Sequence, residues 1–161
     1  MHVVKFFFNS LIIAAVVRTM DDVLAMKHIL HNIKIKLDLS ETDNCDQDIC
    51  RIIKQAEGLA LVALNLDATS FSGTGLGRLL TTSGSILKQL NLTKTNISDA
   101  ALVGVQLPKL ETLGLKGCSN LTSTGVQELL TTSGSILKRL NLTETNISDA
   151  VLVGVQLPKL E

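Results

Sequence analysis

The sequence predicts an α/β fold, a curved solenoid or horseshoe with a parallel β-sheet on its concave side and helices on its convex side. Three observations lead to this prediction: one long segment occurs twice, a leucine pattern recurs at short intervals, and the apolar residues are almost all aliphatic. Repeats of about 20–50 residues are typical of stacked strand-and-helix units. Each unit in such a stack buries its apolar face only against its neighbours.

The duplication is the clearest of these signals. Residues 79–111 and 129–161 form two blocks of 33 residues at an offset of 50. The blocks differ at three pairs of positions, namely Gln89 and Arg139, Lys94 and Glu144, and Ala101 and Val151. Identity at this level indicates that one segment of the chain has been duplicated.

A shorter pattern, Leu-x-x-Leu-x-Leu-x-x-Thr/Cys, predicts the strands. Its second leucine falls at Leu37, Leu64, Leu90, Leu113 and Leu140, and Lys34 replaces the first leucine of the earliest, degraded copy. Successive copies are 27, 26, 23 and 27 residues apart. Because side chains alternate along a strand, Leu-x-Leu places two leucines on one face. We therefore expect five short strands whose leucines form internal columns.

Turns should follow the strands, and proline should stop each return segment. A small residue that can bond local backbone groups ends each complete copy of the pattern: Thr69, Thr95, Cys118 and Thr145. Pro108 and Pro158 stand just before the positions at which the next strand is expected.

The return segments carry the spacing of helices. Apolar residues recur at helical intervals within 75–80, 100–103 and 126–130. Ser98 and Ser148 stand where helix N-caps are expected, with Asp99 and Asp149 in the first turn. Gly84 and Gly134 are expected to end the longer helices.

Residues from about 33 to 161 resemble the leucine-rich repeat family. The stretch that contains Leu110, Leu113, Leu115, Cys118 and Leu121, followed by Thr122 and Gly125, is close to the cysteine-containing subclass. That subclass is similar to the repeats of F-box adaptor proteins. The resemblance implies a non-catalytic protein–protein interaction module, such as the substrate-recognition arm of an SCF-type ubiquitin ligase adaptor. No F-box is recognisable in residues 1–60, so the ligase role rests on analogy.

Two segments are expected in the chain: residues 1–32 and the repeats of residues 33–161. The last of about five repeats is truncated, because residues 158–161 match residues 108–111, which run on into Leu113 and Leu115. A solenoid needs a polar terminal cap. We therefore expect a fragment, a truncated gene product, or a chain that caps itself against a partner.

Residues 1–32 are open to two interpretations. An N-terminal helical cap or degenerate repeat is indicated by Leu11, Ile12, Ala15 and Val16, which recur at helical spacing. A signal peptide over residues 1–17 is indicated by Lys5 and the apolar run after it, although Asn9 and Ser10 interrupt that run. The run is too short for a membrane-spanning helix.

Charge and glycosylation signals bear on partners and location. Fifteen basic residues balance 15 acidic ones, so no long-range attraction to nucleic acid or an anionic membrane is expected. Five N-x-S/T sequons occur, at Asn91, Asn96, Asn120, Asn141 and Asn146. Sugars at Asn91 and Asn141 would obstruct the expected binding face. We expect a cytoplasmic chain, or a secreted or cell-surface one if residues 1–17 are a signal peptide.

Residues that could carry chemistry have simpler structural interpretations. His2, His28 and His31 lack nearby metal-ligand partners in the sequence. Residues 73–78 lack the Lys-Ser/Thr pair of a phosphate loop and are expected to be a turn that opens a helix. Cys118 is expected to be a packed thiol, and Cys45 and Cys50 to be free thiols. We expect no catalytic residue, no metal, no cofactor and no small-molecule substrate.

The strand positions between the leucines should face the concave surface in four columns. The first is Lys36, Ala63, Gln89, Thr112 and Arg139. The second is Asp38, Asn65, Asn91, Gly114 and Asn141. The third is Ser40, Asp67, Thr93, Lys116 and Thr143. The fourth is Glu41, Ala68, Lys94, Gly117 and Glu144.

A protein partner is expected on these columns. The candidate binding residues are Gln89, Asn91, Lys94, Lys116, Arg139, Asn141 and Glu144. Two of the three differences between the blocks fall here, as diversification of a binding face or as neutral drift would produce. The alternatives to an adaptor arm are a secreted or cell-surface recognition receptor and a structural spacer in a larger repeat array.

Overall fold

The computed structural model describes residues 2–8, 11–17, 34–40 and 46–161, with side chains described in the last two ranges. Its strands are β1 (His2–Phe8), β2 (Leu11–Val17), β3 (Ile35–Asp38), β4 (Leu61–Asn65), β5 (Gln89–Asn91), β6 (Thr112–Gly114) and β7 (Arg139–Asn141). The α-helices are α2 (Asp46–Ala56), α3 (Leu76–Ser83) and α4 (Ser123–Ser133). The 3-10 helices are η1 (Gly84–Ile86), η2 (Asp99–Ala101), η3 (Gly134–Ile136) and η4 (Asp149–Leu152).

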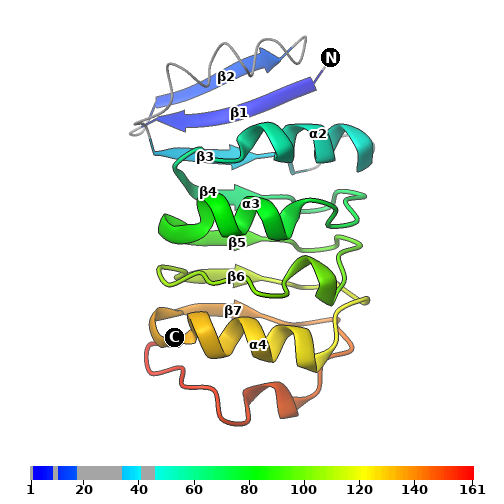
Figure 1. Ribbon diagram of the computed structural model, residues 1–161, viewed down its shortest axis with the longest axis vertical. Coiled ribbons are helices and arrows are strands. Elements are labelled where there is room, and N and C mark those ends of the chain that lie inside the picture. Colours follow the sequence, from blue (N-terminus) through cyan, green and yellow to red (C-terminus); the bar gives the residue numbers. More distant parts are fainter. Residues whose placement is uncertain (1, 9–10, 18–33, 41–45) are drawn as a thin grey trace.

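The strands form one sheet in the order β2-β1-β3-β4-β5-β6-β7. From β3 to β7 the strands are parallel and follow chain order, while β1 is antiparallel to both β2 and β3. The helices lie along one face of the sheet, and α2, α3 and α4 each connect one parallel strand to the next (Figure 1). The predicted α/β fold with a parallel sheet is therefore confirmed.

The N-terminal segment differs from the predicted helical cap. Residues 2–8 and 11–17 form the two antiparallel strands β1 and β2, and residues 18–33 lie outside the described part of the chain. The reason is local, because the Val, Ile and Phe residues of both runs favour strands. Helical and strand spacing are hard to tell apart in apolar runs this short.

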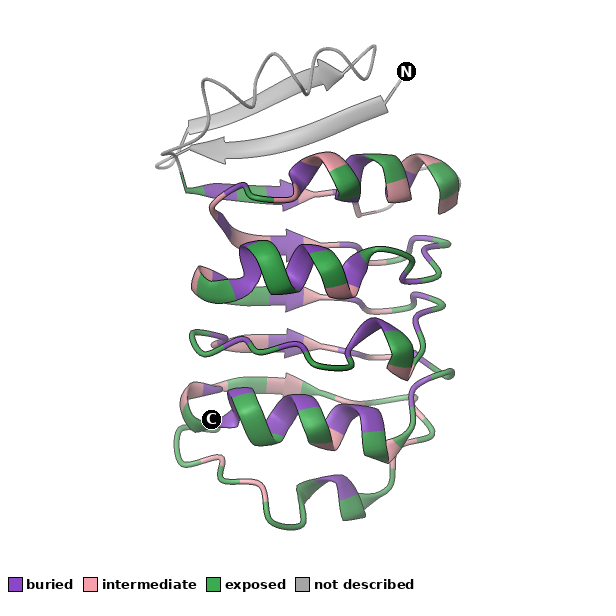
Figure 2. Cartoon of the chain, in the orientation of Figure 1, coloured by how far each residue is buried: buried purple, intermediate pink, exposed green. Residues whose placement is uncertain are grey.

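The predicted interior leucine row is present. Leu37, Leu64, Leu90, Leu113 and Leu140 are paired in register across the five parallel strands. The first four are buried, and Leu140, on the last strand, is partly buried against the same core. Figure 2 shows buried residues both along the strands and along the helices that cover them. Each buried leucine contributes roughly 1.5–3 kcal/mol to folding, so these rows supply much of the stability.

The small residues after the strands bond the backbone as predicted. The hydroxyls of Thr69, Thr95 and Thr145 donate to the carbonyl oxygens three residues earlier at 2.8, 2.6 and 2.6 Å. Cys118 instead donates its thiol hydrogen to Leu92 in the preceding unit at 2.9 Å. The small side chain at this position therefore adds a hydrogen bond to a backbone carbonyl oxygen at the turn, and the carbonyl oxygen of Leu92 accepts from both Thr95 and Cys118.

The return segments are partly as predicted. Residues 73–75 form the expected turn, and α3 begins at Leu76 after Gly75. Gly84 and Gly134 are the C-caps of α3 and α4. The expected helix over residues 100–103 is only the short 3-10 helix η2, with Ser98 at its N-cap. Gly104, whose φ of 69° favours glycine, lies three residues after the end of η2, in the turn that follows it.

Side chains of neighbouring return segments bond one another. Both oxygens of Asp99 accept hydrogen bonds from Thr122, from its N–H at 2.9 Å and its hydroxyl at 2.6 Å. Asp46 accepts the N–H and hydroxyl of Ser72 in the same manner at 2.8 and 2.9 Å. These charge-assisted bonds fix the spacing of one return segment against the next.

Candidate functional site

The sheet face away from the helices carries two rows of side chains that alternate with the buried leucines. The start row lies toward the beginning of the strands and contains Lys36, Ala63, Gln89, Thr112 and Arg139. The end row contains Asp38, Asn65, Asn91, Gly114 and Asn141. The two rows match the first and second predicted columns residue by residue, because strand alternation and leucine spacing together fix the register.

The asparagine side chains of the end row form local turns with the backbone where the strands end. Oδ1 of Asn65, Asn91 and Asn141 accepts the N–H of the second residue further on, each at 3.1 Å. This is the local bond that asparagine favours in turns. The Nδ2 groups of Asn91 and Asn141 bond no other residue in the described part of the chain. Two amide donors are therefore available to a bound molecule.

Gly114 interrupts the end row and gives its neighbour room. A Cβ at this position would stand 2.7 Å from Oδ1 of Asn91 and 3.3 Å from Oγ1 of Thr93. Because these distances are shorter than ordinary van der Waals contact, a larger residue would displace Asn91. The glycine thus places no side chain on the open face of β6, so the surface is recessed there between β5 and β7.

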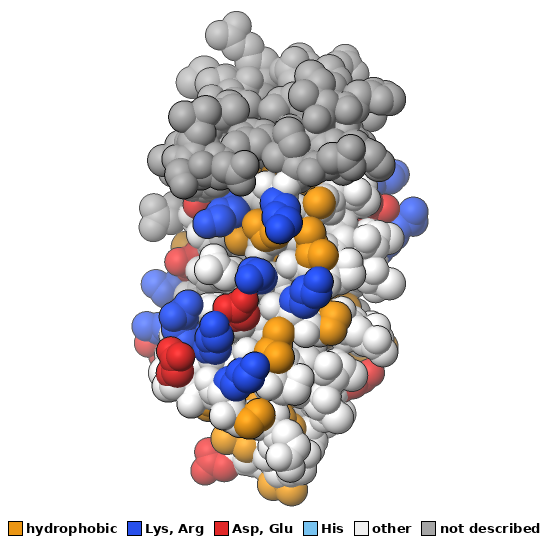
Figure 3. All heavy atoms as spheres, turned by 90° about the vertical axis from the view of Figure 1, so that its left-hand side faces the viewer, with side chains coloured by type: hydrophobic (Ala, Val, Ile, Leu, Met, Phe, Trp, Pro, Cys, Tyr) orange, Lys and Arg blue, Asp and Glu red, His pale blue; other side chains and the backbone are white. Residues whose placement is uncertain are grey.

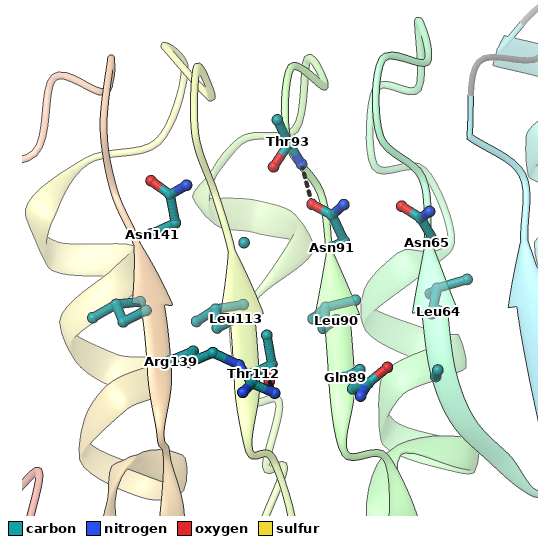
Figure 4. Close-up of a pocket in the computed structure, with 13 residues that line it drawn as sticks. Leu64, Asn65, Gln89, Leu90, Asn91, Thr93, Thr112, Leu113, Arg139 and Asn141 are labelled. Atoms are coloured by element: carbon teal, nitrogen blue, oxygen red, sulfur yellow. Dashed lines mark hydrogen bonds between the residues drawn. The ribbon is translucent and has the colours of Figure 1, made fainter. Parts of the chain in front are cut away.

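A hollow of about 520 Å³ lies over these two rows from β4 to β7. Figure 4 shows Gln89, Thr112 and Arg139 on one side of it and Asn65, Asn91 and Asn141 on the other. Arg139 extends over β6 and donates to the hydroxyl of Thr112 at 3.2 Å. The lining offers amide, hydroxyl and guanidinium groups above a leucine floor, which suits recognition of a polar surface.

The fourth predicted column lies in the turns beyond the end row. Ala68, Lys94, Gly117 and Glu144 share a left-handed backbone, with φ between 53° and 70°. The N–H groups of Ala68, Lys94 and Gly117 donate to the neighbouring turns at 2.7–3.0 Å. For Ala68 and Lys94, this lateral bonding holds a non-glycine residue in a conformation that favours glycine. Glu41, the first member of the predicted column, lies outside the described residues.

The seven predicted binding residues therefore divide into two groups. Gln89, Asn91, Arg139 and Asn141 line the hollow. Lys94, Lys116 and Glu144 lie in or beside the turns past its rim, where Lys116 pairs with Glu144 at 3.1 Å. Thr112 and Gly114 also line the hollow, and their places in the predicted columns were the signal that could have added them to the candidates.

A charged cluster at the start of the strands was not among the predicted site residues. Glu111 bonds Lys88 through Oε1 at 2.9 Å and Lys138 through Oε2 at 3.0 Å. The hydrogen bonds from Lys88 and then from Lys138 lower the pKa of Glu111 from 4.5 to about 2. The signal in the sequence was the lysine directly before the strand in both blocks.

This cluster predicts that the stability of the folded protein depends on pH. Since folding depresses the pKa of Glu111, its contribution to stability is present above its unfolded pKa, about 4.5, and is lost as pH falls toward 2. Glu111→Gln is therefore expected to flatten the decline of the urea unfolding midpoint between pH 4.5 and 2. Glu161→Gln, the equivalent change in the second block, is the control and should keep the decline. Equal curves for wild type and Glu111→Gln would contradict this prediction.

The thiols are placed for packing. Cys118 is buried, and both Cys50 and Cys118 are free, while Cys45 lies outside the described residues. Burial, and then the nearby carboxylate of Asp46, raises the pKa of the Cys50 thiol. A raised pKa leaves less thiolate at neutral pH, so Cys50 is poorly suited to nucleophilic chemistry.

Among the described residues, no group of three or more histidine, cysteine or acidic side chains could hold a metal ion. The side chains of His2, His28 and His31, for which no metal site is expected, lie outside the described part. No helix within the described ranges has the length and apolar character needed to cross a membrane.

Comparison with known proteins adds no family assignment. Neither the protein-family models nor the curated proteins include a match to this chain. The class that the fold and the candidate site define is therefore an α/β protein with a parallel sheet and an open, polar-lined sheet face.

Proposed function

We propose that this chain is a leucine-rich repeat solenoid that binds another protein on the uncovered face of its sheet. The observation that carries the proposal is the open hollow across β4 to β7, about 520 Å³ in volume and lined by differing polar side chains. Beneath it, leucines recur in register on every strand. A constant core with a varied surface suits a non-catalytic binding module, because surface residues can change without loss of the scaffold.

The order of the strands supports the solenoid. Five parallel strands follow chain order, and successive copies of the leucine pattern are 23–27 residues apart. Small polar residues after the strands bond the backbone within a unit or in the preceding one. The sequence resemblance extends the proposal to an adaptor arm that presents substrates to a ubiquitin ligase.

A cytoplasmic location belongs to the same proposal. Two sequon asparagines use their amide hydrogens in bonds between neighbouring units. Nδ2 of Asn120 donates to the carbonyl oxygen of Asn96 at 3.3 Å, and Nδ2 of Asn146 donates to that of Ser119 at 3.0 Å. These contacts give the two asparagines a structural role that does not depend on glycosylation.

Site-specific photocrosslinking in cells tests the proposed binding face. A benzophenone amino acid placed at Gln89 or at Thr112 stands on the hollow, whereas Thr81 and Thr131 are exposed on the helices. We expect the two hollow positions to capture one shared set of proteins and the two helix positions to miss that set, because only the hollow faces the partner. Capture of the same proteins from all four positions, or capture of none from Gln89 and Thr112, would count against the proposal.

A further inference from the structure

Charge is unevenly distributed on this chain, although its formal net charge is zero. Basic side chains gather at the start of the parallel strands, and we define the basic edge as Lys36, Lys88, Lys109, Lys138, Arg139 and Lys159. Figure 3 shows Lys and Arg side chains running down this side of the molecule. Acidic residues lie mainly at the opposite edge, after the strands or at the beginning of helices: Asp38, Asp46, Asp67, Asp99, Glu144 and Asp149.

The duplication explains why the basic edge is periodic. Lys88 and Lys138 are equivalent residues of the two blocks, each directly before a strand, and so are Lys109 and Lys159 in the turns formed with proline. Neighbouring strands in a sheet are about 4.8 Å apart. The lysines therefore stand in a series across the sheet and not in one local cluster.

Acidic side chains balance only part of the basic edge. Glu111 pairs with Lys88 and Lys138, so each of its two carboxylate oxygens already has a lysine partner. Lys36, Lys109, Arg139 and Lys159 form no ion pair with any residue that the structure describes. Glu161, whose N–H donates to the carbonyl oxygen of Lys138, is a second carboxylate at this edge. The basic residues of the edge still outnumber these two carboxylates, so an excess of positive charge remains at the start of the strands.

The start row continues this surface into the hollow. Between Lys36 and Arg139 it contains Ala63, Gln89 and Thr112, and no carboxylate. The guanidinium of Arg139 and the amide of Gln89 are donors suited to a carboxylate, and arginine can bind one through two parallel bonds. An anionic group lying along this row therefore finds donors without a repelling charge.

We propose that the basic edge and the start row bind an acidic, extended segment of the protein partner, laid across the strands from β3 to β7. This inference rests on the proposed protein-binding function and adds the chemistry of the partner. Four strand spacings amount to about 19 Å, the length of roughly six extended residues. A short run of aspartate or glutamate matches the length and the charge of the surface.

A protein segment suits this surface better than a nucleic acid does. Binders of single-stranded nucleic acid usually combine a basic groove with exposed aromatic rings on which bases stack. Phe71 is the only aromatic residue in the ranges with described side chains, and it is fully buried. The acidic opposite edge would also repel a long polyanion that extended past the sheet.

The duplicated block supplies substitutions that the fold already accepts. Arg139→Gln introduces the residue found at position 89, Gln89→Arg introduces the one at 139, and Lys94→Glu introduces the one at 144. Lys94 was a candidate binding residue, but it lies in a turn after β5, past the rim of the hollow and away from the basic edge, so it is not part of the surface proposed to bind the acidic segment. Lys94→Glu changes net charge by two and Arg139→Gln by one, so the control alters the long-range charge more than the test variant does.

The test is fluorescence anisotropy with the full 161-residue chain and labelled ten-residue peptides of alternating glutamate and serine, or glutamine and serine. At low salt we expect the glutamate peptide to bind at least about tenfold more tightly than the glutamine peptide. Exposed ion pairs are modest, so Arg139→Gln should weaken the glutamate peptide about fivefold and Gln89→Arg should strengthen it about as much. Lys94→Glu should leave the affinity within about twofold.

Three results would overturn the inference. They are equal affinity for the two peptides, an effect of Lys94→Glu as large as that of Arg139→Gln, and tighter binding of a ten-nucleotide single strand than of the glutamate peptide. Circular dichroism melts of each variant separate loss of binding from loss of fold. Partner capture from Gln89 and Thr112 with no preference for the glutamate peptide would leave the protein-binding function standing and reject only the acidic partner.

Discussion

Leu90→Ala is expected to lower the free energy of unfolding by about 2–5 kcal/mol, whereas Leu140→Ala should cost about half of that or less. The two leucines are equivalent residues of the duplicated blocks, so their local sequences are nearly the same. Leu90 is only 1% exposed and has in-register leucines on both sides, at Leu64 and Leu113. Leu140 is partly buried and is paired on one side only.

The expected difference between the two losses of stability arises from packing, because both substitutions replace leucine by alanine. Removing three carbons from a closed site loses their transfer free energy and leaves a cavity, whereas a half-open site can fill with water or relax. Urea unfolding of the 161-residue chain and the two variants measures both costs. Equal losses, independent of protein concentration, would show that β7 is as well covered as β5 and would contradict the prediction.

The parts of the fold that repeat could be predicted from the sequence. Leucine spacing placed Leu64, Leu90 and Leu113 in one interior row, and alternation then placed Gln89, Thr112 and Arg139 on the open face. Both results follow from the two-residue period of a strand and from stacking of similar units. They need no knowledge of contacts between residues distant in sequence.

Features that depend on a particular backbone conformation were not predictable in this way. The N-terminal strands could not be told from the helical cap that was one of two interpretations of this segment, because a short apolar run fits both periods. The left-handed turn residues Ala68, Lys94 and Glu144 carry no glycine signal; only Gly117 in that column does. At Ala68 and Lys94 this conformation is held by bonds to the neighbouring turn, and these bonds depend on the completed sheet.

The positions of the residues that line the candidate site could be predicted, but the ion pairs beside it could not. Gln89, Asn91, Arg139 and Asn141 line the hollow as the columns required. The pairing of Glu111 with both Lys88 and Lys138 was missed, since Lys138 follows Glu111 by 27 residues and the three side chains meet only across neighbouring units. A sequence period locates strands, but it does not state which long side chains on adjacent units are close enough to pair.

Gly125→Ala is expected to destabilise the protein by about 2 kcal/mol, although helix propensity alone predicts a gain of about 0.5–1 kcal/mol for this change. Gly125 is a buried residue of the first turn of α4. A Cβ there would overlap the carboxyl carbon and Oδ1 of Asp99, in the neighbouring return segment. Asp99 would have to move and give up its two bonds to Thr122, and the loss of charge-assisted bonds outweighs the gain in propensity.

A double-mutant cycle separates the two effects. Asp99→Gly removes the carboxylate and also the Asp99 Cβ, which would stand 2.7 Å from the new methyl group. In that background Gly125→Ala should become stabilising by about 0.5–1 kcal/mol, because only helix propensity then distinguishes the two residues. Asp99→Ala, which keeps the crowded Cβ, should reverse the effect only in part. If Gly125→Ala has the same sign and size in all three backgrounds, its cost does not come from Asp99, and the contact between neighbouring return segments is not what requires glycine at this position.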